Sequence, residues 1–192
     1  MPPKCRFTRE EIIQAALDLT AEKGVGALTA RGLAQRLGSS AKPIFGLFAN
    51  MEEVQQEVVK AANLRYQEYL RQDMSAGRYP PYKASGMAYI RFAREQRELF
   101  KLLFMRDRTH EEKAAGDELE ALLGLIQKSM GLSRDDAYRF HLEMWIYVHG
   151  IATMIATAYL EWDMDFISAA LTDAYQGLRL RFLPKETEGE IK

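Results

Sequence analysis

Residues 29–48 read TARGLAQRLGSSAKPIFGLF and contain two short helical patterns on either side of Gly38. Apolar residues recur at helical spacing both before and after this glycine. Glycine adopts positive φ without strain, so it permits a sharp turn between two helices. The spacing is typical of a helix-turn-helix, although a plain helical hairpin within a bundle has the same signals. The two apolar stripes are Leu33, Ala34 and Leu37, then Ile44, Leu47 and Phe48.

The second helix of this pair is expected to begin near Ser39 or Ser40. Pro43 is compatible with it only in the first turn, where a missing amide costs nothing. The small residues Ser39, Ser40 and Ala41 keep the start of the helix thin enough for a DNA major groove. The free amides of the first turn can also meet phosphate groups.

Another helix is expected just before this pair. Thr8 and Glu11 have the spacing of a capping box, and Gly24 provides a stop. Thr29 is the expected N-cap of the next helix. Strong helix formers dominate the composition and β-branched runs are scarce, so we predict an all-α fold.

The remaining sequence predicts a series of helices without repeats. Their expected bounds are 51–74, 82–94, 97–105, 109–130 capped by Thr109, a long apolar helix from Ser133 that ends by Trp162 and Asp163, and 165–181. The predicted organisation is a helix-turn-helix domain over 1–52, a helical ligand-binding and dimerisation domain over 53–182, and a flexible tail over 183–192.

Charge and cysteine content narrow the class of protein. Residues 1–50 carry seven Lys and Arg against four Asp and Glu, whereas the whole chain has a net charge of −1. A basic first quarter on an acidic body hints at a module that binds a polyanion. The single cysteine, Cys5, fits a reducing compartment. The apolar run 144–160 is too short and too polar to span a membrane, so we expect a cytoplasmic protein with no membrane contact.

Residues 7–54 resemble the N-terminal DNA-binding domain of the tetracycline-repressor (TetR) family. The shared features are an Ile-x-x-Ala-Ala opening helix, Ala-Glu-x-Gly, Leu-Thr-x-Arg-x-Leu-Ala-x-x-Leu-Gly and a final aromatic-x-x-Phe. The segment ELFKLLFMRDR at 98–108 is also similar to a segment of the ligand domains of some such regulators. The resemblance implies a homodimer that binds a palindromic operator on double-stranded DNA, with half-sites about 34–36 Å apart.

By this resemblance, residues of the helix-turn-helix should meet the groove or the phosphates, and Lys42 is the best candidate for a polar contact. The predicted DNA-binding residues are Thr29, Arg31, Ser40, Ala41, Lys42, Pro43 and Phe45. The family usually has tyrosine where Phe45 stands and lysine where Met51 stands. Both usual residues tend to serve the DNA backbone, so their loss should weaken binding and flatten its salt dependence. Ser39, Pro43 and Gly46 also depart from the family pattern.

Small residues along the last two predicted helices permit close approach of helix axes. We interpret them as a homodimer interface of four helices around a twofold axis, which the resemblance also implies. The alternative is that they pack within the subunit. The predicted interface residues are Ala152, Thr153, Ala156, Ala170 and Ala174.

Aromatic residues of the middle helices exceed what a helical bundle needs, and His141, Trp145 and His149 share one helical face. They predict a cavity for a small apolar or aromatic ligand. The alternative is that each of these side chains belongs to the core. The predicted lining residues are Tyr89, Phe92, Phe100, Phe104, Phe140, His141, Met144, Trp145 and His149.

No motif of enzymatic chemistry occurs in the sequence. It lacks paired cysteines, His-Glu-x-x-His, Gly-x-Ser-x-Gly and a phosphate-binding glycine loop. We therefore expect no catalytic residues, no metal and no cofactor. The sequence favours a DNA-binding transcriptional regulator that responds to a ligand as a repressor. The alternative is a helical small-molecule carrier or interaction module with weakened DNA binding.

Overall fold

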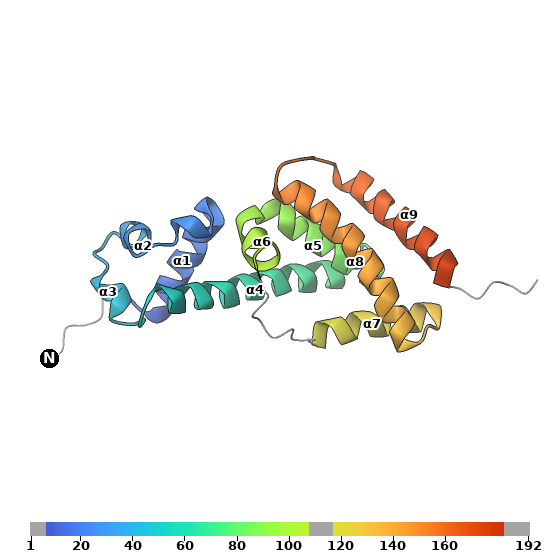
Figure 1. Ribbon diagram of the computed structural model, residues 1–192, viewed down its shortest axis with the longest axis horizontal. Helices are drawn as coiled ribbons and strands as arrows, with labels where there is room; N and C mark the ends of the chain where they lie inside the picture. The colour runs from blue at the N-terminus through green and yellow to red at the C-terminus, as the bar shows by residue number, and fades with distance from the viewer. Residues whose placement is uncertain (1–6, 108–116, 183–192) are drawn as a thin grey trace, which may run out of the picture.

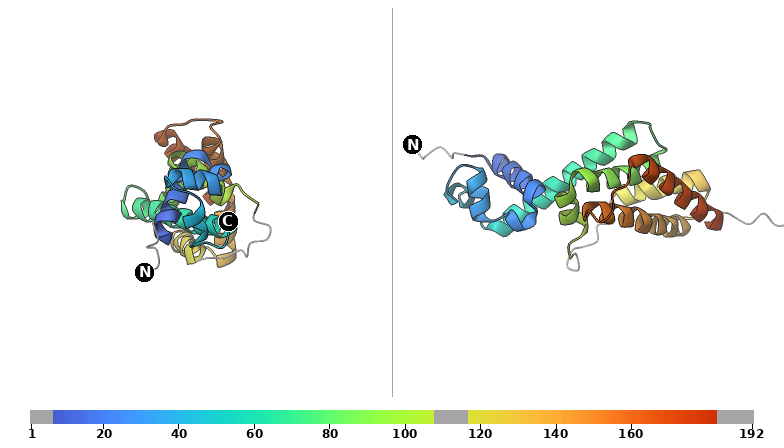
Figure 2. Two further views of the ribbon diagram at one scale, coloured as in Figure 1. Left: turned by 90° about the vertical axis from the view of Figure 1, so that its left-hand side faces the viewer. Right: turned by 90° about the horizontal axis from the view of Figure 1, so that it is seen from above.

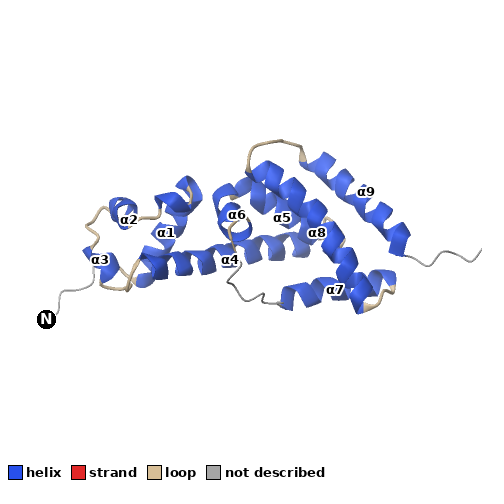
Figure 3. Ribbon diagram, viewed as in Figure 1, coloured by secondary structure: helices blue, strands red, loops and turns tan. Residues whose placement is uncertain are grey.

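The computed structural model describes residues 7–107 and 117–182, and these residues form helices joined by loops, with no strand among them (Figure 3). The all-α prediction is confirmed. The elements are α1 (Arg9–Lys23), the short 3-10 helix η1 (Val25–Ala27), α2 (Ala30–Arg36), α3 (Lys42–Phe45), α4 (Met51–Ser75), α5 (Pro81–Glu95), α6 (Arg97–Phe104), α7 (Asp117–Met130), α8 (Arg134–Ala156) and α9 (Met164–Phe182).

The first helix begins and ends where its sequence signals predict. The Thr8 hydroxyl accepts a hydrogen bond from the Glu11 amide at 3.1 Å, and the Glu11 carboxylate accepts one from the Thr8 amide at 2.8 Å. This is a complete capping box. Gly24 ends α1 with φ of +78° and donates its amide to the Thr20 carbonyl at 2.8 Å.

The turn between α2 and α3 explains why α3 begins later than predicted. Gly38 has φ of +60°, its amide bonds to the Gln35 carbonyl, and the Ser39 amide bonds to the Ala34 carbonyl. These paired bonds form a Schellman motif that completes α2. Ser39 therefore belongs to the end of α2. Helix α3 begins at Lys42, with Pro43 in its first turn.

Helix α4 connects the two ends of an elongated molecule (Figures 1 and 2). Its first half packs against α1 and its second half against α5. The buried residues Val54, Val58, Ala62, Tyr66 and Leu70 follow one stripe along its whole length. The predicted boundary between 52 and 53 falls in its first turn, and one hydrophobic cluster extends from α1 across α4 to α9. The N-terminal helices therefore share a core with the C-terminal ones.

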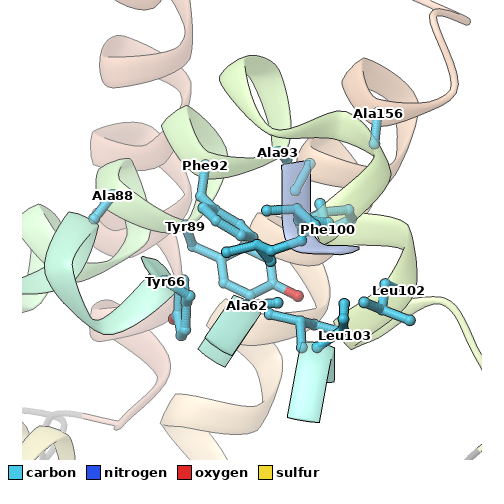
Figure 4. Close-up of a cluster of buried hydrophobic side chains, with 14 of the residues drawn as sticks. Ala62, Tyr66, Ala88, Tyr89, Phe92, Ala93, Phe100, Leu102, Leu103 and Ala156 are labelled. Carbon is cyan, nitrogen blue, oxygen red and sulfur yellow. The ribbon is translucent and has the colours of Figure 1, made fainter. Parts of the chain in front are cut away.

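Aromatic rings fill the centre of the C-terminal half (Figure 4). Phe92 and Phe100 are fully buried. The ring of Tyr66 lies 5.4 Å from that of Phe92, and the ring of Tyr89 lies 5.2 Å from that of Phe100, measured between centroids. Edge-to-face and tilted pairs of this kind add to the stability that burial provides. They fix α4, α5 and α6 to one another.

The later helices differ from prediction at the end of α8. Ser133 caps α8 as expected, and its hydroxyl accepts the Asp136 amide at 3.1 Å. However, α8 ends at Ala156, ahead of Trp162. Ala158 has φ of +55°, a left-handed conformation that cannot continue a right-handed helix. The predicted cap Thr109 and the predicted tail at 183–192 lie outside the described residues.

Candidate DNA-binding surface and ligand cavity

One side of α3 is buried and the other faces solvent. Ile44 is fully buried against the N-terminal core, whereas Lys42, Phe45 and Gly46 are exposed. Phe45 leaves 49% of its surface accessible, which is high for a phenylalanine. The exposed side of α3 therefore combines one cation, one aromatic ring and one stretch of bare backbone.

The other predicted DNA-binding residues surround this surface. Thr29 and Arg31 are exposed at the start of α2, and Ser40 is exposed in the turn. The Thr29 hydroxyl accepts the Gly32 amide at 3.0 Å and so caps α2, as its position predicted. Ala41 and Pro43 are half-buried.

Arg31 and Lys42 are two cations of this surface that are available for an external anion, whereas Arg36 and Arg9 are paired with carboxylates. Arg36 pairs with Glu22 at 2.7 Å, and this hydrogen bond lowers the pKa of Glu22 and raises that of Arg36. Arg9 is similarly paired, as described below. In contrast, no carboxylate of residues 7–107 or 117–182 forms an ion pair with Arg31 or Lys42. Their positive charge can therefore be offered to phosphate groups.

Arg9 of α1 holds the connection between α3 and α4. Its guanidinium donates to the Leu47 carbonyl at 2.9 Å and to the Glu53 carboxylate at 2.8 Å, and it lies 4.2 Å above the Phe48 ring. Glu53 also accepts the Ala49 amide at 2.7 Å. That backbone hydrogen bond and the Arg9 contact lower the pKa of Glu53. Arg9 could not be predicted from the sequence, because its partners lie about forty residues away in the chain.

A cavity of about 1350 Å³ lies among α4, α5, α6, α7, α8 and α9. It is larger than the usual range for ligand sites, about 300–1,000 Å³. Its walls come from two separate hydrophobic clusters. The smaller cluster joins α7 to the beginning of α8 and comprises Leu123, Ile126, Ala137, Phe140 and Met144.

The cavity divides the predicted lining residues into two groups. Those at its wall are Tyr89, Phe104, His141, Met144 and Trp145. Phe92, Phe100 and Phe140 are fully buried in the core instead, and His149 lies behind Trp145, stacked on its ring with centroids 4.8 Å apart. Residues spaced along one helix face share a direction, but the packing of neighbouring helices decides which of them meet empty space.

Other lining residues were not predicted from the sequence. They come from α4, α7 and α9, whose amphipathic patterns look like ordinary core stripes. The principal ones are Val59, Asn63, Tyr66, Gln67, Leu119, Leu122, Leu125, Leu171, Thr172 and Tyr175. A polar residue beside an apolar stripe, as at Asn63 and Gln67, is the only sequence signal that points to them.

Polar and charged side chains are interspersed in a wall whose surface is largely apolar. The Tyr82 hydroxyl lies 3.2 Å from His141 Nδ1, and Gln67 donates to the Glu118 carboxylate at 2.7 Å. The Tyr66 hydroxyl lies 3.4 Å from the same carboxylate. Burial raises the pKa of both tyrosines, and Glu118 adds to the rise at Tyr66. Both phenols therefore stay neutral, and the oxygen of each can accept a hydrogen bond from an occupant, whereas the Tyr66 proton is already donated to Glu118.

The predicted interface residues also separate. Ala152 and Ala156 are buried within the subunit, at 0% and 2% exposure, because α8 packs on α5 and α6 there. They are therefore not accessible to a partner subunit. Thr153, Ala170 and Ala174 are half-buried. The exposed apolar side chains of α8 and α9 are larger: Tyr138, Leu142, Trp145, Ile146, Tyr147, Phe166 and Leu180.

We expect the free energy of unfolding to fall as pH is lowered through about 6.5, the ordinary histidine pKa. Burial lowers the pKa of His141 and His149. Above that pH both histidines are neutral whether the chain is folded or unfolded, so they do not reduce the free energy of unfolding. Below it the unfolded chain binds protons first, and stability declines until the folded pKa values are passed.

Urea unfolding at a series of pH values checks this expectation. The double variant His141→Gln, His149→Gln should show a flatter profile between pH 6.5 and 5. Carboxylates with lowered pKa, such as Glu22 and Glu53, also reduce the free energy of unfolding when they are protonated, but only nearer pH 4.5. This second decrease should occur in the wild-type protein and in the double variant alike. An identical slope in the two proteins would contradict the expectation.

Two features are absent from residues 7–107 and 117–182. No helix among them is long and apolar enough to cross a membrane. No group of three or more His, Cys, Asp or Glu side chains in the same part of the chain could hold a metal ion.

Comparison with known families agrees with these features. Residues 12–58 match the model described as bacterial regulatory proteins, tetR family, and residues 82–175 match the tetracyclin repressor-like C-terminal domain. No curated protein matches the chain. The two matches together cover most of the sequence, the first over α1 to the start of α4 and the second from α5 into α9, which line the cavity together with α4. The chain belongs to the tetracycline-repressor (TetR) family of DNA-binding transcriptional regulators.

Proposed function

We propose that this regulator is a ligand-responsive repressor that binds a palindromic operator as a homodimer. One observation carries the proposal: two of the helices that line the cavity, α4 and α6, also pack on α1, the helix that supports the DNA-binding surface. The second half of α4 contributes Asn63, Tyr66 and Gln67 to the wall, and its first half packs on α1. A change of shape at the cavity can therefore reach α1 through a single rigid element.

Helix α6 supports the same connection by a second route. Leu103 and Phe104, at its end, line the cavity. Glu98, at the beginning of α6, lies close to Gly24, the C-cap of α1: a Cβ added at Gly24 would be 2.7 Å from a Glu98 carboxylate oxygen. A ligand that favours a different position of α6 would also displace α1. It can shift this equilibrium only by its difference in affinity for the two positions.

The cavity favours a ligand with an apolar or aromatic body and a few polar groups. Leucine and aromatic side chains make up much of the wall, and polar or charged side chains, among them Lys83, Glu118 and Lys128, are interspersed between them. Such an arrangement gives affinity through apolar burial and orientation through single hydrogen bonds.

The exposed apolar side chains of α8 and α9 support a homodimer. Ile146 is 65% exposed, and Leu142 lies one turn before it on the same helix. Phe166 and Leu180 extend the apolar surface onto α9. An apolar surface of this kind is rarely left exposed to water in a stable monomer. Two copies related by a twofold axis would cover it with the same surface of the partner.

Replacing Ile146 by arginine is expected to convert the dimer into monomers at micromolar concentration, because two like charges would meet an apolar surface near the twofold axis. Sedimentation equilibrium measures the result. Leu64→Arg is the matched control, since Leu64 is 71% exposed on α4 and lies outside the proposed interface. A dimeric Ile146→Arg protein, or a monomeric Leu64→Arg protein, would show that the interface lies elsewhere.

Arg9 is expected to position α3 without touching DNA. Arg9→Ala should weaken operator binding but leave the slope of log K against log salt unchanged, because no phosphate contact is lost. Arg9→Lys keeps the charge but cannot reach Leu47 and Glu53 together as the guanidinium fork does, so it should be nearly as weak. If lysine restored full affinity, charge rather than position would be the role of Arg9.

Selection of bound fragments from the genome of the source organism tests the proposed function. The expected result is a palindromic site whose duplex is released when the inducing ligand is added. Sites without twofold symmetry would contradict the homodimer. Failure to bind any duplex, even at low salt, would favour the alternative of a small-molecule carrier.

A further inference from the structure

We infer that Phe45 reads a thymine methyl group in each half-site of the operator. The inference rests on the proposed function, because it assumes that the exposed side of α3 enters the major groove. It adds a base preference, which neither the family matches nor the fold specify.

The side chains available on α3 leave few ways to read a base. Bidentate contacts to adenine come from Asn or Gln, contacts to cytosine from Asp or Glu, and contacts to guanine from Arg or Lys. Residues 37–48 contain none of these types except Lys42. Asn50, which follows, uses its side-chain oxygen to cap α4 by accepting the Glu53 amide at 2.9 Å. Hydrogen-bonded readout by side chains of residues 37–48 is therefore limited to Lys42 and the short hydroxyls of Ser39 and Ser40.

Phe45 supplies the apolar alternative. Its ring is half-exposed, and no ring contact to it occurs within residues 7–107 or 117–182. It lies three residues after Lys42, on the same exposed side of α3, and it has no hydroxyl with which to donate to a phosphate. The 5-methyl group of thymine is the one apolar group that an unmodified base pair presents in the major groove. Contact between the two removes apolar surface of both from water.

Gly46 gives the ring room to approach. Its φ of −78° and ψ of −18° are ordinary helical values, so the backbone does not require glycine there. A Cβ at Gly46 would meet its nearest atom, the Pro43 carbonyl oxygen, at 3.4 Å, which is normal contact. The fold therefore tolerates a side chain at this exposed position. Its absence leaves bare backbone beside Phe45, so that the ring and Lys42 protrude farthest toward a duplex.

Substitution of deoxyuridine for thymidine tests the inference, because it removes the methyl group and keeps base pairing. The operator duplex recovered by selection is synthesised with each thymine replaced in turn, at symmetric positions of both half-sites. For one thymine position, replacement should lower the affinity of the wild-type protein by about fourfold for each methyl group removed. Replacement in both half-sites should lower it by about fifteenfold. Phe45→Ala should bind the thymine and uracil duplexes equally, and Phe45→Tyr, which keeps the ring, should retain the difference.

Circular dichroism checks that the variants fold, which is expected for an exposed residue. The inference is overturned if no thymine position affects the wild-type protein, or if Phe45→Ala keeps the full preference for thymine. Those results leave operator binding itself intact. A wild-type protein that binds no duplex at all instead overturns the proposed function, and this inference with it.

Discussion

Replacing Arg31 and Lys42 together by alanine is expected to abolish specific operator binding, with affinity about 10⁴-fold lower if each of four lost contacts is worth tenfold. Four contacts are lost because the proposed homodimer carries both residues twice. Neither residue has an ion-pair partner among the described residues, so their charge is free for phosphate. The slope of log K against log salt should also decrease by about 3 to 4.

The matched control is the double variant Lys60→Ala, Arg71→Ala, which removes the same two types of cation from exposed positions of α4. Binding is measured by fluorescence anisotropy over a salt series, and the oligomeric state is checked by sedimentation. The control should bind with nearly wild-type affinity. Equal weakening of both variants would mean that overall charge, and not the α2–α3 surface, determines binding.

Phe92→Ala is expected to lower the free energy of unfolding by about 3–5 kcal/mol, the usual cost of emptying a buried aromatic site. Phe92 is fully buried between Tyr66 and Tyr69, with ring centroids 5.4 and 5.2 Å away. Trp145→Ala should cost only about 1 kcal/mol, because that ring is 43% exposed at the cavity wall and mainly stacks on His149.

Urea unfolding at matched protein concentration distinguishes the two variants. The midpoint should fall strongly for Phe92→Ala and little for Trp145→Ala, with similar m-values. When measured on folded protein, affinity for an apolar ligand should fall more for Trp145→Ala than for Phe92→Ala. Of these two residues, only Trp145 lines the cavity. A comparable loss of stability in both variants would mean that Trp145 belongs to the core.

Most helix boundaries could be predicted because their signals are local. Thr8, Thr29 and Ser133 cap the helices that follow them, and Gly24 and Gly38 have the positive φ that ends a helix. Each cap depends on a few neighbouring residues, so a single sequence contains the information. The later start of α3 was missed because two hydrogen bonds at the end of α2 use Gly38 and Ser39 first.

The cavity could be predicted only in part. A stripe of aromatic residues on one helix indicates burial, and burial is common to core and cavity wall. Phe92 and Trp145 share that pattern in the sequence, yet one is fully buried and the other half-exposed. The difference depends on where α7 and α9 lie against α8, which involves contacts between residues far apart in the chain. The same reason explains why Ala152 and Ala156 proved to be internal.

The sequence by itself determined the helical class, the helix-turn-helix and the family, since these follow from caps, periodicity and motif spacing within short segments. Only the tertiary structure decided which aromatic side chains line the cavity, which face of α8 stays exposed, and how Arg9 holds α3. Those features require several helices to meet in space. Local sequence sets the shape of each helix, whereas packing among helices sets what each side chain touches.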